Sequence, residues 1–277
     1  MSTQKKIDSA FQRRFGPWAL VTGASEGIGE AFAERLAERG LNLVLVARRA
    51  PLLDALAARL NRAHGVECLV IPADLSKPTA IDDLVARVAD LDVGLVVAAA
   101  GYGTSGPLLH TPLDAENGML GLNCNSVLAL AWHFGQRLAA RGQGGIVFMS
   151  SLLAFRGAPR AANYAATKAY IQTLAEGLRS EWAAHGVDVI ASAPGPIRSG
   201  FERRANMQMG HAMPADVVAR VTLQALGRRT TVRPGWLSKL LGWSLALLPR
   251  WAQIRIIGAV MKGMTGHQAP GAARLAP

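Results

Sequence analysis

The sequence predicts an α/β fold: one doubly wound parallel sheet with helices on both faces, followed by a helical C-terminal extension. Six short runs rich in Val, Ile and Leu alternate with longer helical patterns between residues 18 and 191. The apolar runs show little alternation with polar residues, which is typical of strands buried on both faces. Strands and helices that alternate in this way join into a parallel sheet through right-handed crossovers.

The predicted elements follow these runs in order along the chain. Strands are expected at residues 18–21, 41–46, 66–71, 93–98, 146–149 and 187–191. Helices are expected between them at residues 28–39, 52–64, 79–89, 113–140 and 162–184. In such sheets ligands bind beyond the carboxyl ends of the strands, so functional residues are expected just after each strand.

The pattern changes after residue 198. One more helix is expected at residues 214–227, and two apolar helices at 236–248 and 251–264 are separated by Pro249. We interpret residues 1–277 as a single domain with a core at about 16–235 and an extension at about 236–277.

Composition excludes several classes of protein. Half of the residues are apolar and 18% are charged, so disorder along the whole chain is excluded. Two cysteines, Cys68 and Cys124, are too few for a disulfide scaffold or a structural zinc site, and the six histidines lack metal-binding spacing. The first 15 residues lack the apolar core of a secretory signal, and no apolar run approaches the roughly 20 residues of a membrane span. A cytoplasmic protein without a metal is expected.

Positive charge is concentrated at the C-terminal end. Residues 198–277 hold 12 Lys and Arg against 2 Asp and Glu, whereas residues 1–197 hold 18 against 17. This asymmetry indicates an anionic partner, such as a phosphorylated ligand, an acidic protein or anionic lipid. Nucleic acid is not expected, because the basic residues do not alternate with aromatic residues on a known reader module.

A glycine-rich turn links the first predicted strand to its helix. Its spacing is G-x-x-x-G-x-G, and glycines here let backbone amides approach a pyrophosphate at the helix N-terminus. Its place after the first strand favours a nucleotide site over a turn that needs glycine for conformation alone. The candidate cofactor-binding residues of this turn are Gly23, Ser25, Glu26, Gly27, Ile28 and Gly29.

The end of the second predicted strand indicates NADP(H) rather than NAD(H). An acid usually accepts the ribose 2′-hydroxyl of NAD at this point, whereas the chain has Arg48 and Arg49, which suit a 2′-phosphate. Glu26 beside the phosphate turn argues mildly against this choice. After the third strand, Asp74 and Leu75 fit a contact with adenine, although Asp74 also fits an N-cap of the next helix.

Tyr164 and Lys168 form the pattern with the clearest chemistry. Residues four apart share a helix face, and an ammonium beside a phenol lowers its pKa toward the working pH. Tyr164 can then act as a general acid or base in the interconversion of a carbonyl and an alcohol. Ser151 ends the preceding strand, thirteen residues upstream of Tyr164.

Together these motifs resemble the short-chain dehydrogenase/reductases over roughly residues 18–200, which implies a Rossmann-type fold and an NAD(P)-dependent oxidoreductase. The stretch at residues 15–29 is also similar to the fatty-acyl and steroid ketoreductases of that family. The resemblance rests on residues 22–29, Asp74-Leu75, Asn123, Ser150-Ser151, Tyr164, Lys168 and residues 194–199.

The resemblance implies a role for each catalytic candidate. Tyr164 protonates the substrate oxygen or deprotonates an alcohol, while Lys168 lowers the Tyr164 pKa and holds the nicotinamide ribose. Ser151 polarises the carbonyl. Asn123 holds a water that links Lys168 to solvent; alignment to the family motif favours Asn123, although Asn125 also fits.

Further cofactor contacts follow from the same resemblance. Pro194, Gly195 and Ile197 contact the nicotinamide, and Ser199 replaces the usual threonine. The family's N-N-A-G motif is replaced by residues 98–101, so Ala99, Ala100 and Gly101 are expected to bind through backbone atoms. Another group must then supply the hydrogen bonds of the lost asparagines.

The substrate is expected to be a hydrophobic carbonyl or alcohol. The resemblance makes residues 201–213 a lid, and the candidate lining residues are Gly103, Ser105, Leu153, Phe155, Phe201 and Met207. An alternative is that the lid residues only pack on the body. A homodimer or homotetramer is expected, and the C-terminal helices are interpreted as packing on the body, on a second subunit or on anionic membrane. The alternative function is a non-catalytic NADP(H) sensor or membrane-surface scaffold.

Overall fold

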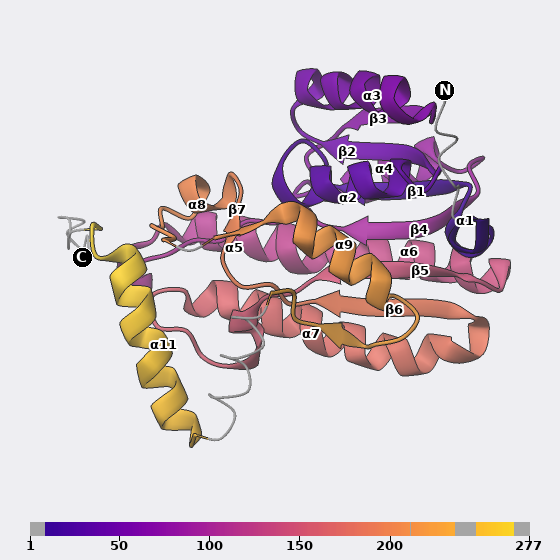
Figure 1. The fold of residues 1–277 in the computed structure, drawn as a ribbon. Coiled ribbons are helices and arrows are strands. Elements are labelled where there is room, and N and C mark those ends of the chain that lie inside the picture. Colours follow the sequence, from indigo (N-terminus) through magenta and orange to yellow (C-terminus); the bar gives the residue numbers. More distant parts are fainter. Residues whose placement is uncertain (1–8, 211, 236–247, 269–277) are drawn as a thin grey trace.

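A seven-stranded parallel sheet forms the centre of the computed structural model, which describes residues 9–210, 212–235 and 248–268 (Figure 1). Its strand order is β3-β2-β1-β4-β5-β6-β9, so the chain changes direction across the sheet between β1 and β4. The strands are β1 (Trp18–Thr22), β2 (Asn42–Ala47), β3 (Cys68–Pro72), β4 (Val93–Ala98), β5 (Gly144–Met149), β6 (Val187–Ser192) and β9 (Thr231–Val232). The predicted doubly wound α/β fold is confirmed.

Helices cover both faces of the sheet. Helices α1, α2, α3 and α9 contribute to the apolar core on one face, and α4, α6 and α7 to the core on the other. The helices are α1 (Ser9–Phe15), α2 (Gly27–Ala37), α3 (Ala50–His64), α4 (Ala80–Arg87), α5 (Leu113–Leu120), α6 (Ser126–Arg141), α7 (Ala162–Trp182), α8 (Phe201–Arg204), α9 (Ala215–Ala225) and α11 (Arg250–Thr265).

The burial of the strands explains their sequence. Every residue of β4, β5 and β6 is buried, because helices cover both of their faces. Aromatic side chains fill the core on each side: Phe32 of α2 lies in one core, and Phe134 of α6 lies in the other. Continuous Val, Ile and Leu runs are therefore the pattern that these strands require.

The predicted helix at residues 113–140 is wrong in one respect. It is two helices, α5 and α6, joined by a π-helical turn at Gly121–Asn125. Helical periodicity does not distinguish a single π turn from a regular one, although such turns often occur at functional sites. The extra residue buries the side chain of Asn123 and leaves Asn125 exposed.

The segment after β6 contains short elements that the periodicity did not predict. Strand β7 (Ile197–Arg198) pairs with β8 (Met213–Pro214), which joins the two ends of the segment carrying α8. Strand β9 has only two residues, too few to produce a recognisable pattern. The helix predicted at 214–227 is α9, which ends at Ala225.

Helix α11 packs against the body of the molecule. Ile257, Met261 and Thr265 are buried on its inner side, and Arg160 donates a 3.1 Å hydrogen bond to the carbonyl of Thr265. This packing gives no support to the membrane interpretation of the extension. The helix predicted at 236–248 lies outside the described residues. Among the residues that the structure describes, no helix is long and apolar enough to cross a membrane.

Candidate active site

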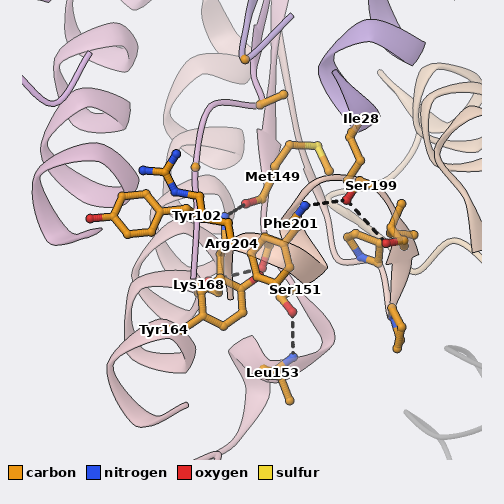
Figure 2. A pocket seen from close by; sticks show the side chains of 18 of the residues that line it. Ile28, Tyr102, Met149, Ser151, Leu153, Tyr164, Lys168, Ser199, Phe201 and Arg204 are labelled. Carbon is orange, nitrogen blue, oxygen red and sulfur yellow. Dashed lines mark hydrogen bonds between the residues drawn. The ribbon is translucent and has the colours of Figure 1, made fainter. Parts of the chain in front are cut away.

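A cavity of about 390 Å³ opens at the carboxyl ends of the strands, and Figure 2 shows many of the side chains that line it. One part of its wall, the glycine-turn side, consists of lining residues that follow β1, β2, β3 and β4: Gly23, Glu26, Gly27, Ile28, Gly29, Arg48, Asp74, Leu75, Ala99, Ala100 and Gly101. The opposite part, the apolar side, consists of Leu153, Phe155, Phe201, Met207, Met209, Ile256, Ile257, Val260, Met261 and Met264.

The glycine-rich turn brings backbone close to the cavity. A Cβ atom at Gly29 would lie 2.2 Å from the carbonyl oxygen of Gly23, so only glycine allows α2 to begin this close to β1. The N-cap residue of α2, Glu26, makes no side-chain cap hydrogen bond. The first amides of α2 are therefore not capped by this side chain, and the turn fits the pyrophosphate of a dinucleotide.

The two arginines after β2 have different surroundings. Arg48 lines the cavity. Arg49 instead lies outside it, where it donates a hydrogen bond to Ser25 Oγ (2.9 Å) and forms an ion pair with Glu26 (Nη2 to Oε1, 3.0 Å). Among the predicted residues of this turn, Ser25 is therefore placed against Arg49 rather than in the wall of the cavity.

Asp74 closes its own turn. Its Oδ1 atom accepts hydrogen bonds from Ser76 N (3.2 Å) and Ser76 Oγ (2.7 Å), whereas the N-cap of α4 is Thr79. Burial opposes its ionisation, but the Ser76 hydrogen bonds and the charges of Arg48 and Lys77 together lower the pKa of Asp74. Asp74 and Leu75 line the cavity as a charged and an apolar surface side by side.

The hydroxyl of Thr22 makes two hydrogen bonds with the backbone at the end of β4. Its hydroxyl accepts from the amide of Ala100 (3.0 Å) and donates to the carbonyl of Val97 (3.4 Å). These bonds link the end of β1 to the end of β4. The backbone of Ala99 and Gly101 consequently keeps its place in the wall of the cavity.

Ser151, Tyr164 and Lys168 all line the cavity, where α7 faces the end of β5 (Figure 2). Tyr164 and Lys168 are buried, with 8% and 6% of their surfaces exposed. Lys168 Nζ donates to the carbonyl of Met149 (2.8 Å) and lies 5.7 Å from the centroid of the Tyr164 ring. Ser151 Oγ accepts from the amide of Leu153 (3.2 Å), which fixes its position at the strand end.

The expected lowering of the Tyr164 pKa is not seen, and this prediction is corrected. Burial raises the pKa of Tyr164 to about 12, while hydrogen bonding to Ser151 acts in the opposite direction. Burial also lowers the pKa of Lys168 to about 8. For Tyr164, desolvation of the buried phenol outweighs the hydrogen bond with Ser151.

Of the two candidate asparagines, the structure places Asn123 beside the catalytic candidates. Its Nδ2 atom donates to Tyr102 O (2.8 Å) and Thr167 Oγ1 (3.1 Å), and its Oδ1 atom accepts from Tyr102 N (3.1 Å). A Cβ atom placed on Gly101 would lie 3.0 Å from Asn123 Oδ1 and 3.6 Å from Lys168 Nζ. Asn123 Oδ1 and Lys168 Nζ therefore lie close to the same point beside Gly101.

The segment after β6 contributes Pro194, Gly195, Ile197 and Ser199 to the wall. The hydroxyl of Ser199 accepts a 3.3 Å hydrogen bond from the amide of Phe201. Ser199 thus stabilises the start of α8 at the point where the chain crosses the cavity.

Four of the six predicted substrate residues line the cavity: Leu153, Phe155, Phe201 and Met207. The Phe201 and Tyr164 rings lie 5.3 Å apart between centroids.

The predictions for Gly103 and Ser105 are corrected, since neither lines this cavity. A Cβ atom at Gly103 would lie 2.7 Å from Phe201 Cζ, so the Phe201 ring covers this position. Ser105 donates to the carbonyl of Ala205 (2.5 Å) and accepts from Gln268 (2.7 Å) outside the wall.

Sequence reasoning missed two groups of lining residues. Helix α11 provides half of the apolar side, and the spacing of Ile257, Met261 and Met264 on one helical face was an available signal. Three arginines also line the cavity: Arg156, Arg204 and Arg233. No local pattern identified them, because each follows or ends an element that is short or irregular.

Known proteins are similar to this chain in sequence. A family model described as short chain dehydrogenase matches residues 17–210. A 7β-hydroxysteroid dehydrogenase from Collinsella aerofaciens is 33% identical over 178 residues, which cover 64% of this chain and 68% of the relative.

Solved structures are also similar. One from a study of 7β-hydroxysteroid dehydrogenase stereoselectivity has a TM-score of 0.83 at 28% identity, covering 89% of this chain and 98% of the other. A short-chain dehydrogenase from Sphingobium yanoikuyae in complex with NADPH has a TM-score of 0.76 at 30% identity, covering 84% and 96%. The chain therefore belongs to the short-chain dehydrogenase family and is an NAD(P)-dependent oxidoreductase.

Proposed function

We propose that the protein reduces the carbonyl group of a bulky, hydrophobic substrate with NADPH. The observation that carries this proposal is the composition of one cavity. Ser151, Tyr164 and Lys168 lie in its wall between the glycine-turn side and the largely apolar opposite side. The similarity to a 7β-hydroxysteroid dehydrogenase supports a substrate of this size and polarity.

The glycine-turn side would hold the cofactor. The backbone from Gly23 to Gly29 fits the pyrophosphate, Asp74 and Leu75 fit the adenine, and Arg48 fits a 2′-phosphate. Lys168, Gly195 and Ile197 would contact the nicotinamide half, with the start of α8 held by Ser199. The bound nicotinamide supplies hydride chemistry, which no side chain of the protein provides.

Tyr164 would donate the proton to the substrate oxygen. Because burial raises the pKa of Tyr164 to about 12, the phenol holds its proton at neutral pH and has one to give to the substrate oxygen. Ser151 Oγ, held by the Leu153 amide, would donate a second hydrogen bond to the same oxygen. Asn123 Oδ1 and Lys168 Nζ lie close to the same point beside Gly101, where Asn123 would hold a water that passes a proton from solvent through Lys168 to the phenolate after each cycle.

We further propose that the protein is a homo-oligomer. Large apolar side chains are exposed on neighbouring helices: Leu113 on α5, Leu128 and Trp132 on α6, and Tyr170 on α7. Burial of these side chains against a second copy of the chain would remove apolar surface from water, which supports the proposal. Light scattering should give a mass of two or four chains, and a single-chain mass would contradict the proposal.

The reaction is tested by following NADPH consumption with a panel of carbonyl compounds. The panel should run from short aldehydes to bulky ketones, including oxosteroids and long-chain oxo-esters. We expect turnover of the bulky apolar ketones, with one alcohol formed for each NADPH consumed. Turnover confined to short, polar aldehydes would contradict the proposed substrate class.

A further inference from the structure

Two arginines interrupt the apolar part of the cavity wall. Arg156 follows the short helical turn that carries Leu153 and Phe155, and Arg233 follows β9 at the edge of the sheet. Both line the cavity with the isoleucines and methionines of α11. Neither residue has a task in the proton transfer or in the nucleotide contacts proposed above.

The structure gives neither arginine a carboxylate partner among the described residues. Arg156 Nε donates to the neutral amide oxygen of Gln253. The guanidinium of Arg233 lies 4.3 Å from the centroid of the Phe155 ring, and its Nε atom is buried without a hydrogen-bond partner in the described part of the chain. The side chain of Arg233 thus lines the cavity without an acidic partner among the described residues, and an anion in the cavity would stabilise its charge.

The surrounding sequence provides no acid to neutralise these charges. Residues 151–175 and 217–277 contain neither Asp nor Glu. Two acids lie between the end of β6 and residue 217, and both are engaged elsewhere. Glu202 accepts a hydrogen bond from the amide of Met209, and Asp216 pairs with Arg35. The positive charge around Arg156 and Arg233 is therefore not balanced locally.

The electrostatics agree with this arrangement. Burial, followed by the charges of Arg233 and Arg250, lowers the pKa of Arg156. Arg204, another arginine of the wall, instead interacts with Arg48 and with the carboxylates of Asp74 and Glu26. The cavity thus has two cationic regions, and the one formed by Arg156 and Arg233 is separate from the region suited to the cofactor phosphate.

We infer that the substrate is an apolar carbonyl compound that also carries an anionic group, a carboxylate or a phosphate, bound by Arg156 and Arg233. This inference rests on the proposed function, because it places the substrate on the apolar side of the cavity. Guanidinium groups bind carboxylates and phosphates through paired hydrogen bonds. The Arg156 and Arg233 side chains both line the cavity, so their guanidinium groups would supply the donors for that contact.

The test compares acids with their neutral esters. Suitable pairs are a long-chain oxo-acid and its methyl ester, and an oxosteroid with a side-chain carboxylate and its methyl ester. An oxo-alkyl phosphate tests the second anion. The wild-type protein should show a KM for each acid at least about tenfold below that of its ester. Equal KM values for acid and ester would overturn the inference.

Arg233→Met removes the charge and keeps an apolar stem against Phe155. We expect the KM for the acids to rise roughly tenfold or more, with the KM for the esters unchanged within about twofold. Arg255→Gln is the matched control, because Arg255 is exposed on α11 and does not line the cavity. Equal effects of Arg233→Met on acid and ester would contradict the inference.

A second pair of variants separates charge from the position of α11. Arg156→Lys keeps the charge, so the preference for acids should persist. Gln253→Ala removes the contact that joins Arg156 to α11, so it should raise the KM of acid and ester alike. Loss of the acid preference in Gln253→Ala but not in Arg233→Met would contradict the assignment.

A binding measurement distinguishes failure of this inference from failure of the proposed function. Calorimetry with a saturated long-chain fatty acid and its methyl ester, in the presence of NADP⁺, does not require turnover. If no carbonyl is reduced but the acid binds more tightly and Arg233→Met abolishes the difference, the reaction is wrong and the anion site stands. If carbonyls are reduced and both compounds bind equally, the anion site is wrong.

Discussion

The two sides of the cavity are built by different means. The glycine-turn side comes from residues directly after successive strands, and much of its surface is backbone, as at Gly23, Ala100 and Gly101. The apolar side is assembled from side chains of three separated segments, residues 153–156, 201–209 and 256–264. The shape of the glycine-turn side is therefore set by the sheet itself. The shape of the apolar side depends on how α8 and α11 pack across the sheet.

This difference predicts that changes on the glycine-turn side affect the nucleotide, and changes on the apolar side affect the carbonyl compound. The largest effect is expected for Gly29→Ala, since its Cβ atom would lie 2.2 Å from Gly23 O. The turn must then move, and the Kd for NADPH should rise by at least about 100-fold. Calorimetry measures it, and Gly210→Ala, with no atom within 4 Å of the added Cβ, is the control.

Arg48→Asp tests the choice of cofactor on the same side. The guanidinium lines the cavity, and an acid there suits a ribose hydroxyl rather than a phosphate. We expect the Kd for NADPH to rise roughly 30-fold and that for NADH to change less than about threefold. Arg49→Asp is a useful comparison, because Arg49 pairs with Ser25 and Glu26. Equal losses for the two cofactors in Arg48→Asp would refute its assignment.

Ile257→Ala tests the apolar side. This side chain is buried on α11 and contacts the cavity, so truncation removes part of the wall. The KM for a bulky ketone should rise roughly tenfold, while the Kd for NADPH stays within about twofold. If NADPH binding weakened as much as ketone binding, the two sides would not be independent. Arg255→Ala, an exposed change on the same helix, serves as the control.

Lys168 lies where the two sides meet. Its ionisation is expected to change the free energy of unfolding with pH, which is a smaller effect than the changes in binding described above. Burial lowers its pKa to about 8 from an ordinary value near 10.5. Between these values the unfolded chain binds more protons than the folded protein, so this group makes stability rise with pH.

Relative to Lys168→Met, the free energy of unfolding of the wild-type protein should therefore increase by roughly 1 kcal/mol from pH 7 to pH 9. Urea unfolding at several pH values measures this difference. The exposed Lys262, changed to Met, should show no such trend. A constant difference between wild-type protein and Lys168→Met would show that the ammonium is not desolvated.

Local patterns predicted most of the sheet and the glycine-turn side. Buried strands appear as continuous apolar runs, and the turn appears as a fixed spacing of glycines. They did not predict the π turn at Gly121–Asn125, which changes the helical register by one residue, or the two-residue strand β9. They placed Gly103 and Ser105 in the wall, although the ring of Phe201 and the Ala205 carbonyl occupy those positions. Arg156 and Arg233 become neighbours only when the short helical turn at Leu152–Phe155, the edge of the sheet and α11 pack together. No spacing in the sequence could therefore identify them.

The central claim is that this cavity delivers a proton from Tyr164 to a substrate oxygen. Tyr164→Phe removes only the hydroxyl and keeps the ring against Phe201. The most direct measurement is single-turnover oxidation of bound NADPH by a bulky ketone in the wild-type protein and in this variant. We predict a rate lower by roughly 1,000-fold in the variant, with the Kd for NADPH changed less than about threefold. A variant that keeps more than a tenth of the wild-type rate would contradict the account.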